Sequence, residues 1–241
     1  MSMLPRIRAR VLDRFIFNFW FPVSALAARL PPWLEPQIVG GAAVASFCIL
    51  DLDKVTFGPV PDQLGLRNVN CALRFSVFDR SSKTPAVYVA ERNTNSRLGA
   101  FITSLGFPGH HRHVDVAIRM EADGRAIRVD DGDRLVLAAR VTPGTALTSS
   151  QFASLDAFAA FIAGGVRSYC PSRSPGRYSV VDLHKDDPTY TPLAVHDLRH
   201  DLFGEWGVSA ADAPLDSAIH TSDGRYVWEY IGQRAAVDES H

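Results

Sequence analysis

The sequence predicts an α+β fold built mainly on antiparallel β-sheet. Short segments in which apolar and polar residues alternate recur along the chain, Asp-Gly turns separate several of them, and few stretches have helical spacing. No internal repeat, low-complexity tract or long Gly/Ser linker divides the chain. We therefore expect one domain over residues 1–241, with residues 1–13 and 233–241 as loose tails.

The first half of the chain contains several strand patterns and one short helix. Residues 14–21 (RFIFNFWF) are rich in aromatic and β-branched side chains and predict a strand buried on both faces. Residues 22–33 predict a short helix that a Pro-Pro pair ends. Residues 42–55 predict a second strand. Residues 69–79 and 85–94 flank a polar turn and predict a hairpin.

The second half continues with two helices and a series of short strands. Residues 96–106 have a helical apolar stripe, and residues 154–169 begin with a capping serine, Ser154, so both segments predict helices. The remaining patterns predict strands, and the Asp-Gly turns between the first three of them indicate a meander. These expected strands are residues 113–121, 126–131, 134–142, 177–184, 192–198 and 225–232.

Composition and charge exclude several classes of function. The 25 Lys and Arg against 26 Asp and Glu give a net charge of -1, so we expect no nucleic-acid partner. The apolar run at residues 15–23 is shorter than the ~20 residues of a membrane helix and has no cleavage site of a signal peptide, so we expect no membrane partner. Cys48, Cys71 and Cys170 show no paired spacing, which favours a reducing cytoplasm.

A cluster of histidines follows a Gly-Phe-Pro turn, in the stretch GFPGHHRHVDV of residues 106–116. In an extended segment His111 and His113 point to one face and His110 to the other, so at most two of them converge on a metal. A polar turn or pocket rim explains the cluster at least as well as a metal site. Because nucleotide-binding glycine motifs are also absent, we expect no cofactor.

Only three lysines could supply amine chemistry. Lys83 lies in a polar turn, and Lys185 precedes two aspartates that favour its charged form. Lys54 follows an apolar strand and could face an interior, although a lysine at a strand end usually reaches water. Serine and cysteine nucleophiles have no recognisable motif either.

Polar residues within the expected strands form a different kind of candidate site. Asn70 and Arg74 are four residues apart on one strand and share a face, where an amide and a guanidinium could hold a carboxylate or carbonyl oxygen. Glu91 lies on the neighbouring strand. The alternative, that this face is the solvated outer one, is equally compatible with the sequence.

Three segments together resemble the acetoacetate decarboxylase-like superfamily, most closely an uncharacterised bacterial branch of it. They are RNVNCALRFSVF, VYVAERNTNSRLGAFITSLGFPGHHRHVDV and RSYCPSRSPGRYSVVDLHKDDPTYTPLAV, and the resemblance extends over most of the chain. It implies a cone-like or closed antiparallel sheet around an internal cavity, with a few flanking helices. It also implies that Gly109 and His110 replace the family's imine-forming lysine and the lysine beside it. The resemblance further implies that Asn70 stands where the family has a glutamate, and that Arg74 corresponds to the family's arginine four residues later.

Because glycine cannot form an imine, the resemblance disfavours decarboxylation through a Schiff base. It favours a pocket protein that binds a small organic acid or carbonyl compound and performs non-imine, lyase-type acid/base chemistry. A non-catalytic ligand-binding or assembly protein, and a histidine-based metal enzyme, are the alternatives. Self-association stays open, since the aromatic strand could pair between subunits or lie in a core. The expected catalytic residues are His110 and His111, and the expected substrate-binding residues are Asn70, Arg74, Glu91, Phe107 and His113.

Overall fold

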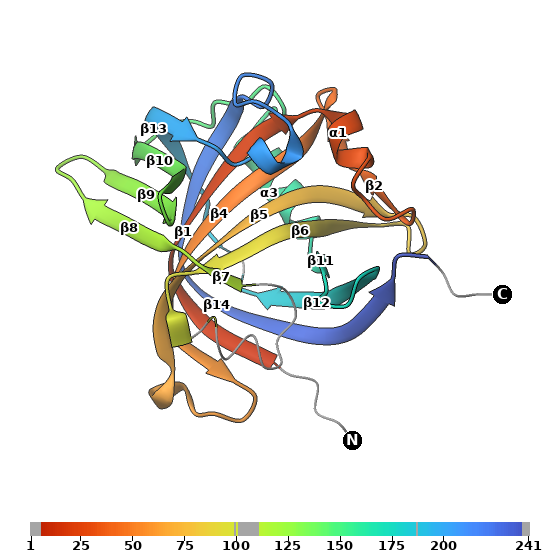
Figure 1. Ribbon diagram of the computed structural model, residues 1–241. Coiled ribbons are helices and arrows are strands. Elements are labelled where there is room, and N and C mark those ends of the chain that lie inside the picture. The colour runs from red at the N-terminus through yellow and green to blue at the C-terminus, as the bar shows by residue number, and fades with distance from the viewer. Residues whose placement is uncertain (1–5, 99, 101–110, 187, 238–241) are drawn as a thin grey trace.

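A curved β-sheet closes on itself to form the body of the protein (Figure 1). The computed structural model describes residues 6–98, 100, 111–186 and 188–237. The strands follow one another around a ring in the order β1, β4, β5, β6, β11, β12 and β14, and β14 pairs again with β1. These strands are β1 (Arg6–Phe21), β4 (Ala42–Phe57), β5 (Leu66–Asp79), β6 (Thr84–Thr94), β11 (Arg167–Pro171), β12 (Arg177–Lys185) and β14 (Leu215–Ala235).

Most neighbouring strands are antiparallel. Among the described strands, β6 pairs in parallel with β11 and with the short β7 (His111–His113), and the other pairings are antiparallel. The predicted hairpin is β5 and β6, whose register pairs Asp79 with Thr84. The long β1 closes the ring, because it pairs with β4 on one side and with β14 on the other along most of its length.

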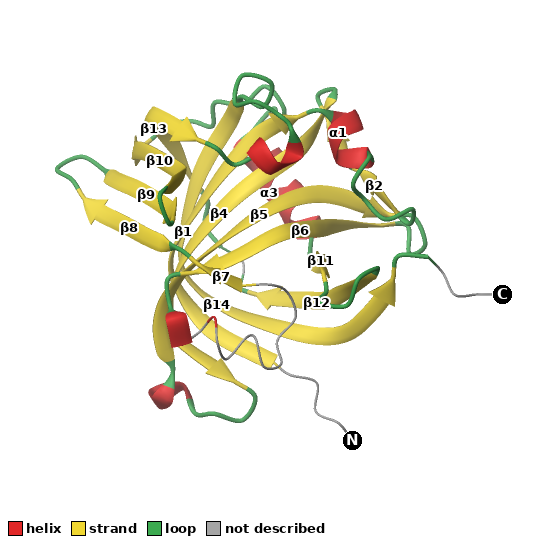
Figure 2. Ribbon diagram, in the orientation of Figure 1, coloured by secondary structure: helices red, strands yellow, loops and turns green. Residues whose placement is uncertain are grey.

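A meander and a few short elements complete the fold (Figure 2). The meander extends the sheet from β14 through β13 (Thr191–His200), β10 (Arg134–Pro143), β9 (Arg125–Asp131) and β8 (Asp115–Met120). Helix α3 (Leu155–Gly164) begins where predicted, since Ser154 Oγ accepts a hydrogen bond of 3.1 Å from the Ala157 amide. The remaining short elements are α1 (Val23–Ala27), β2 (Leu34–Pro36), β3 (Ile38–Val39) and the 3-10 turns at Asp62–Leu64 and Gly204–Trp206.

The two faces of the ring strands have different chemistry. On β1, Phe15, Phe17 and Phe19 face the largest apolar core, which also contains alternate residues of β4 and β5. Arg14, just before Phe15, and Asn18, between Phe17 and Phe19, are buried on the opposite face. Burial on both faces explains why this strand shows no apolar-polar alternation, as the sequence predicted.

The predicted fold class is confirmed: the chain forms a mainly antiparallel, closed sheet with a few short helices. The expectation of loose ends is wrong for residues 6–13 and 233–235. Residues 6–13 form the first half of β1, where Ile7, Ala9 and Val11 are buried and the basic residues between them face outward. Residues 233–235 end β14 and pair with β12. Residues 6–13 form a strand because apolar and basic residues alternate there and because the segment pairs with β4 and β14.

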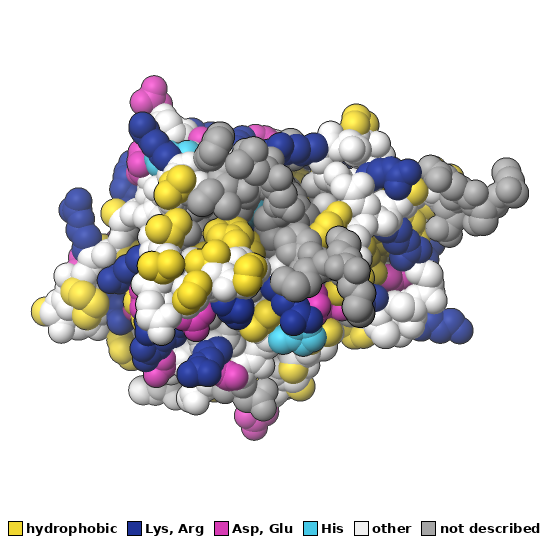
Figure 3. All heavy atoms as spheres, turned by 90° about the horizontal axis from the view of Figure 1, so that it is seen from below, with side chains coloured by type: hydrophobic (Ala, Val, Ile, Leu, Met, Phe, Trp, Pro, Cys, Tyr) yellow, Lys and Arg dark blue, Asp and Glu magenta, His cyan; other side chains and the backbone are white. Residues whose placement is uncertain are grey.

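Helix length and exposed apolar side chains both bear on whether the described part of the chain contacts a membrane or a partner. Within the described residues, none of the helices is both long and apolar enough to traverse a bilayer. Figure 3 shows one face on which hydrophobic side chains gather among charged ones. Leu64, Leu98 and Val166 are among the exposed large apolar residues of the chain. Self-association of the protein stays a prediction.

Candidate functional site

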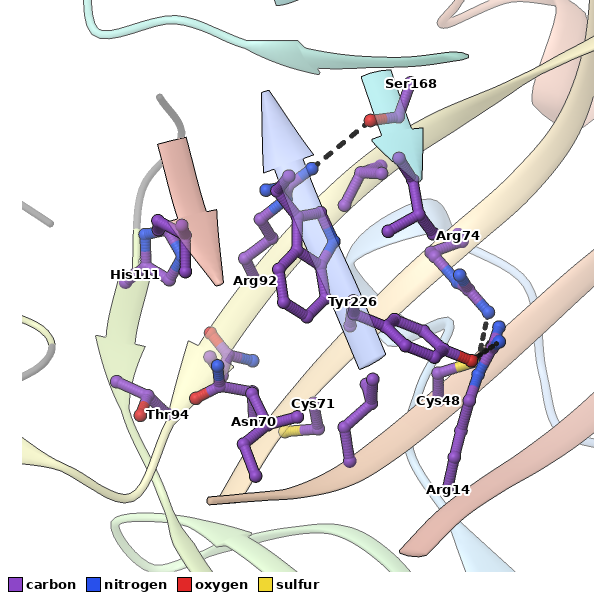
Figure 4. Close-up of a pocket in the computed structure, with 18 of the residues that line it drawn as sticks. Arg14, Cys48, Asn70, Cys71, Arg74, Arg92, Thr94, His111, Ser168 and Tyr226 are labelled. Atoms are coloured by element: carbon purple, nitrogen blue, oxygen red, sulfur yellow. Dashed lines mark hydrogen bonds between the residues drawn. The ribbon is translucent and has the colours of Figure 1, made fainter. Parts of the chain in front are cut away.

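A cavity of about 130 Å³ lies against the inner face of the ring. On the same measure one water molecule needs ~10–15 Å³, so the cavity can take a small organic molecule. Every strand of the ring contributes at least one side chain to its lining, and β7 adds another (Figure 4). Polar and charged lining residues are Arg14, Asn68, Asn70, Arg74, Arg92, Asn93, Thr94, His111, Ser168 and Tyr226.

Two arginines from different strands meet at one end of this cavity. Arg14 of β1 is 2% exposed, and its Nη1 donates to the Tyr226 hydroxyl at 3.0 Å. Arg74 of β5 is partly buried, and its Nη2 contacts Cys48 Sγ. Arg14 Nη2 lies 3.9 Å from the same sulfur. The two guanidinium groups therefore flank one thiol, and both line the cavity.

Neither of these guanidinium groups has a carboxylate partner among the described residues. The Nε atoms of Arg14 and Arg74 are buried and make no hydrogen bond there. Burial lowers the pKa of Arg74, and the nearby charge of Arg14 lowers it further. For Arg14 burial also acts to lower the pKa, but Tyr226 and Cys48 outweigh it and the net shift is upward. Both residues keep their charge at neutral pH, so the cavity holds uncompensated positive charge.

Amide side chains line another part of the cavity. Asn70 shares the inner face of β5 with Arg74, as the sequence predicted from their spacing. Asn68 lies two residues earlier on the same face. The Oδ1 atoms of Asn68 and Asn70 are buried and accept no hydrogen bond from the described residues. Since buried polar atoms are nearly always paired, these amides are suited to bind a polar ligand.

The structure brings one of the expected histidines to the cavity. His111 lines it, and the register of β7 against β6 pairs His111 with Arg92 and His113 with Thr94. His113 thus lies on the same face of β7 as His111, but it is not one of the lining residues. His110 and Phe107 lie outside the described residues.

Glu91 lies on the other face of the sheet. Its register partner on β5 is Leu73, a residue of the apolar core, and not Arg74 or Asn70. A bulge in β6 beside Arg74 separates Glu91 from the inner face. Its carboxylate pairs with Arg112 at 3.2 Å instead of lining the cavity.

None of the three lysines of the chain, all of them described, lines this cavity. Lys54 is exposed in a bulge of β4 with φ of 52°, so the side chain does not reach an interior. Lys83 is exposed in its turn. Lys185 lines a smaller cavity of about 30 Å³, to which Arg14 and Arg74 also contribute. The cavity next to Asn70 and His111 therefore has no amine for an imine.

Several functional candidates escaped the sequence analysis: Arg14, Cys48, Arg92, Ser168 and Tyr226. Arg14 carried a usable signal, because a charged residue begins a strand that is otherwise aromatic and expected to be buried on both faces. Arg92 and Ser168 carried none, since they reach the cavity through strands far apart in sequence.

Within the described residues, no group of three or more His, Cys, Asp or Glu side chains could hold a metal ion. His196 and His200, which are four residues apart in an HxxxH pattern, contact different residues. His196 Nε2 lies 3.2 Å from the Thr142 hydroxyl, whereas His200 packs against Phe19 and Phe203.

The closed β-ring is the acetoacetate decarboxylase-like fold that the sequence resemblance implied, since solved structures with TM-scores of 0.60 to 0.65 share it. The chain belongs to the DUF2071 family of uncharacterized conserved proteins, whose model matches residues 8–225. A sequence comparison with curated proteins gave no match.

Solved structures of several enzymes share this fold. Acetoacetate decarboxylase from Legionella pneumophila is 13% identical, with a TM-score of 0.65 over 96% of this chain and 87% of that chain. The enduracididine biosynthesis enzyme MppR, in its complex with pyruvate, is 16% identical, with a TM-score of 0.60 over 100% and 93%. An acetoacetate decarboxylase-like enzyme from Sphingomonas wittichii RW1 is 11% identical, with a TM-score of 0.61 over 98% and 94%. At these identities the similarity establishes the fold.

Proposed function

We propose that the protein binds a small organic acid in the ring cavity, with the carboxylate held by Arg14 and Arg74. The observation that carries this proposal is the pair of guanidinium groups at the cavity end without a carboxylate partner among the described residues. Two charged groups are costly to bury unless an opposite charge compensates them, and a carboxylate matches the planar fork of arginine. The MppR complex with pyruvate supports a small acid as the ligand class.

Chemistry on the bound acid would proceed without an imine, because all three lysines lie outside this cavity. Among the described lining residues His111 is the side chain suited to exchange a proton near neutral pH. We propose His111 as the proton carrier of a lyase-type reaction, with Arg74 and Asn70 orienting the substrate. As part of the same proposal, His110 is a catalytic residue and Phe107 a substrate-binding residue, as expected from the sequence.

Thermal unfolding in the presence of pyruvate and butyrate, each beside its neutral amide, tests the binding. We expect the acids but not the amides to raise the melting temperature, by roughly 5–10 °C at a hundred times the dissociation constant. Arg74→Met should abolish this shift. Arg80→Met is the matched control, since Arg80 is a surface arginine paired with Glu35. Equal shifts with acids and amides, or an unchanged shift in Arg74→Met, would contradict the proposal.

The reaction class is tested separately. Borohydride treatment with pyruvate, followed by intact mass measurement, should give no adduct, and an adduct on any lysine would restore imine chemistry. If turnover of a keto acid is found, His111→Gln should lower kcat with little effect on binding. Unchanged kcat in that variant would remove His111 from the proposed role.

A further inference from the structure

The positive charges of the cavity occur in two places. Arg14 and Arg74 lie together beside Tyr226, whereas Arg92 of β6 lies apart from them, next to Ser168 of β11 (Figure 4). All three arginines line the same cavity. The arrangement offers an anion two separate binding positions.

The register of β5 and β6 fixes the relative positions of Arg92 and Arg74 on the sheet. Arg92 is the register partner of Ala72, two residues before Arg74 on β5. Residues paired across strands, and residues two apart along one strand, point to the same face. Arg92 and Arg74 are therefore diagonal neighbours on the inner face, with Cα atoms roughly 7–8 Å apart, a distance that the adjacent bulge in β6 adjusts.

Arg92 also lacks a carboxylate partner among the described residues. Its one hydrogen bond there is a long one of 3.4 Å to the Ser168 hydroxyl. None of the residues found to line the cavity is an aspartate or glutamate.

Arginines elsewhere in the described structure commonly pair with carboxylates. Arg167 binds Asp182 through two hydrogen bonds of 2.8 Å, and Arg112 pairs with Glu91 on the opposite face of the sheet. Within the described residues, none of the three arginines that line the cavity has such a carboxylate partner. A ligand with one carboxylate, held at the Arg14–Arg74 pair, would leave Arg92 without an anionic partner.

We infer that the ligand is a short dicarboxylic acid, with one carboxylate at Arg14 and Arg74 and the second at Arg92. This inference rests on the proposed function and specifies its ligand class. A single guanidinium fork suits one carboxylate, which accepts two parallel hydrogen bonds from it. The cavity volume of about 130 Å³ limits the acid to a few carbon atoms between its two ends.

Calorimetric titration with malonate, succinate, glutarate and adipate, each beside its monomethyl ester, tests the inference. The ester keeps the carbon chain of the diacid, removes one charge and adds one methyl group, and the Arg92 variants separate the loss of charge from the added bulk. At least one diacid should bind about tenfold or more tightly than its ester, because a charge-assisted hydrogen bond is gained. In Arg92→Leu and in Arg92→Gln this advantage should vanish, while the ester binds as it does to the unmodified protein.

Binding of the ester also shows that the Arg92 variants are folded. Arg119→Leu is the matched control, since Arg119 is an exposed arginine of β8, and it should keep the preference for the diacid. If no diacid binds more tightly than its ester while Arg74→Met abolishes ester binding, the inference is overturned and the proposed function stands. If neither diacids nor esters bind, both are overturned.

Discussion

Asp79 offers a quantitative test of how the ring is held closed. It ends β5, and its side chain is 2% exposed. It accepts hydrogen bonds from the Tyr169 hydroxyl of β11 and, at 3.2 Å, from Arg234 Nη1 of β14. The Ser81 amide donates a further bond of 2.9 Å. Three strands of the ring therefore meet at one carboxylate, and Asp79→Asn removes its charge with little change of shape.

The size of the effect follows from the pKa of Asp79. Burial acts to raise it, but the hydrogen bonds from Ser81, Tyr169 and Ser82 outweigh burial and lower the pKa from 3.8 to about 2. A difference of nearly two pH units corresponds to about 2 kcal/mol. Because the folded pKa is depressed, this stability is present above about pH 4 and is lost as the pH falls towards 2.

Urea unfolding of both proteins measures the prediction. At pH 7 Asp79→Asn should lower the free energy of unfolding by about 2 kcal/mol, and the difference should shrink as the pH falls below 4. Asp62→Asn is the control, since the ion pair of Asp62 with Arg8 is exposed and should contribute ~0–1 kcal/mol. An Asp79→Asn variant as stable as the unmodified protein at pH 7, or a difference independent of pH, would refute the reasoning.

Two further predictions concern partly buried basic side chains, Arg74 and His200. Arg74→Met should raise the free energy of unfolding by about 1–2 kcal/mol while removing acid binding, because an uncompensated, partly buried charge is replaced by an apolar side chain; a loss of stability in urea would argue that Arg74 is compensated in the free protein. Burial lowers the pKa of His200 below its ordinary 6.5, so the unfolded state takes up the proton first and stability falls as the pH drops from about 7 towards 5. His200→Phe should reduce this fall, as measured by urea midpoints at both pH values, and an unchanged pH dependence would exclude His200 as its source.

Local sequence patterns predicted much of the fold because they report periodicity and turns. The hairpin of β5 and β6, the capped start of α3 and the buried strand at residues 14–21 all depend on residues close in sequence. The start of β1 was predicted less accurately. Its first half, residues 6–13, carries charged residues, and pairing with β4 and β14 makes this segment a strand.

The candidate site was predictable in part. Residues on one strand, Asn70 and Arg74, share a face for a reason that the sequence contains. Glu91 was expected beside them, but the bulge in β6 that turns it to the other face has no clear local signal. Arg14 and Arg92 come to the cavity from other strands, so their meeting with Arg74 depends on how the ring closes.

Local sequence patterns were enough to predict the kinds of elements and the mainly antiparallel sheet, and the sequence has glycine, not lysine, at residue 109. Side-chain periodicity and residue identity are local properties, and they survive whatever the rest of the chain does. Which strand faces line a cavity, and that arginines gather there without an acidic partner among the described residues, became evident from the three-dimensional arrangement of the strands. That outcome depends on strand register, on the bulge in β6 and on the pairing of β14 with β1. This last pairing joins residues more than 200 positions apart.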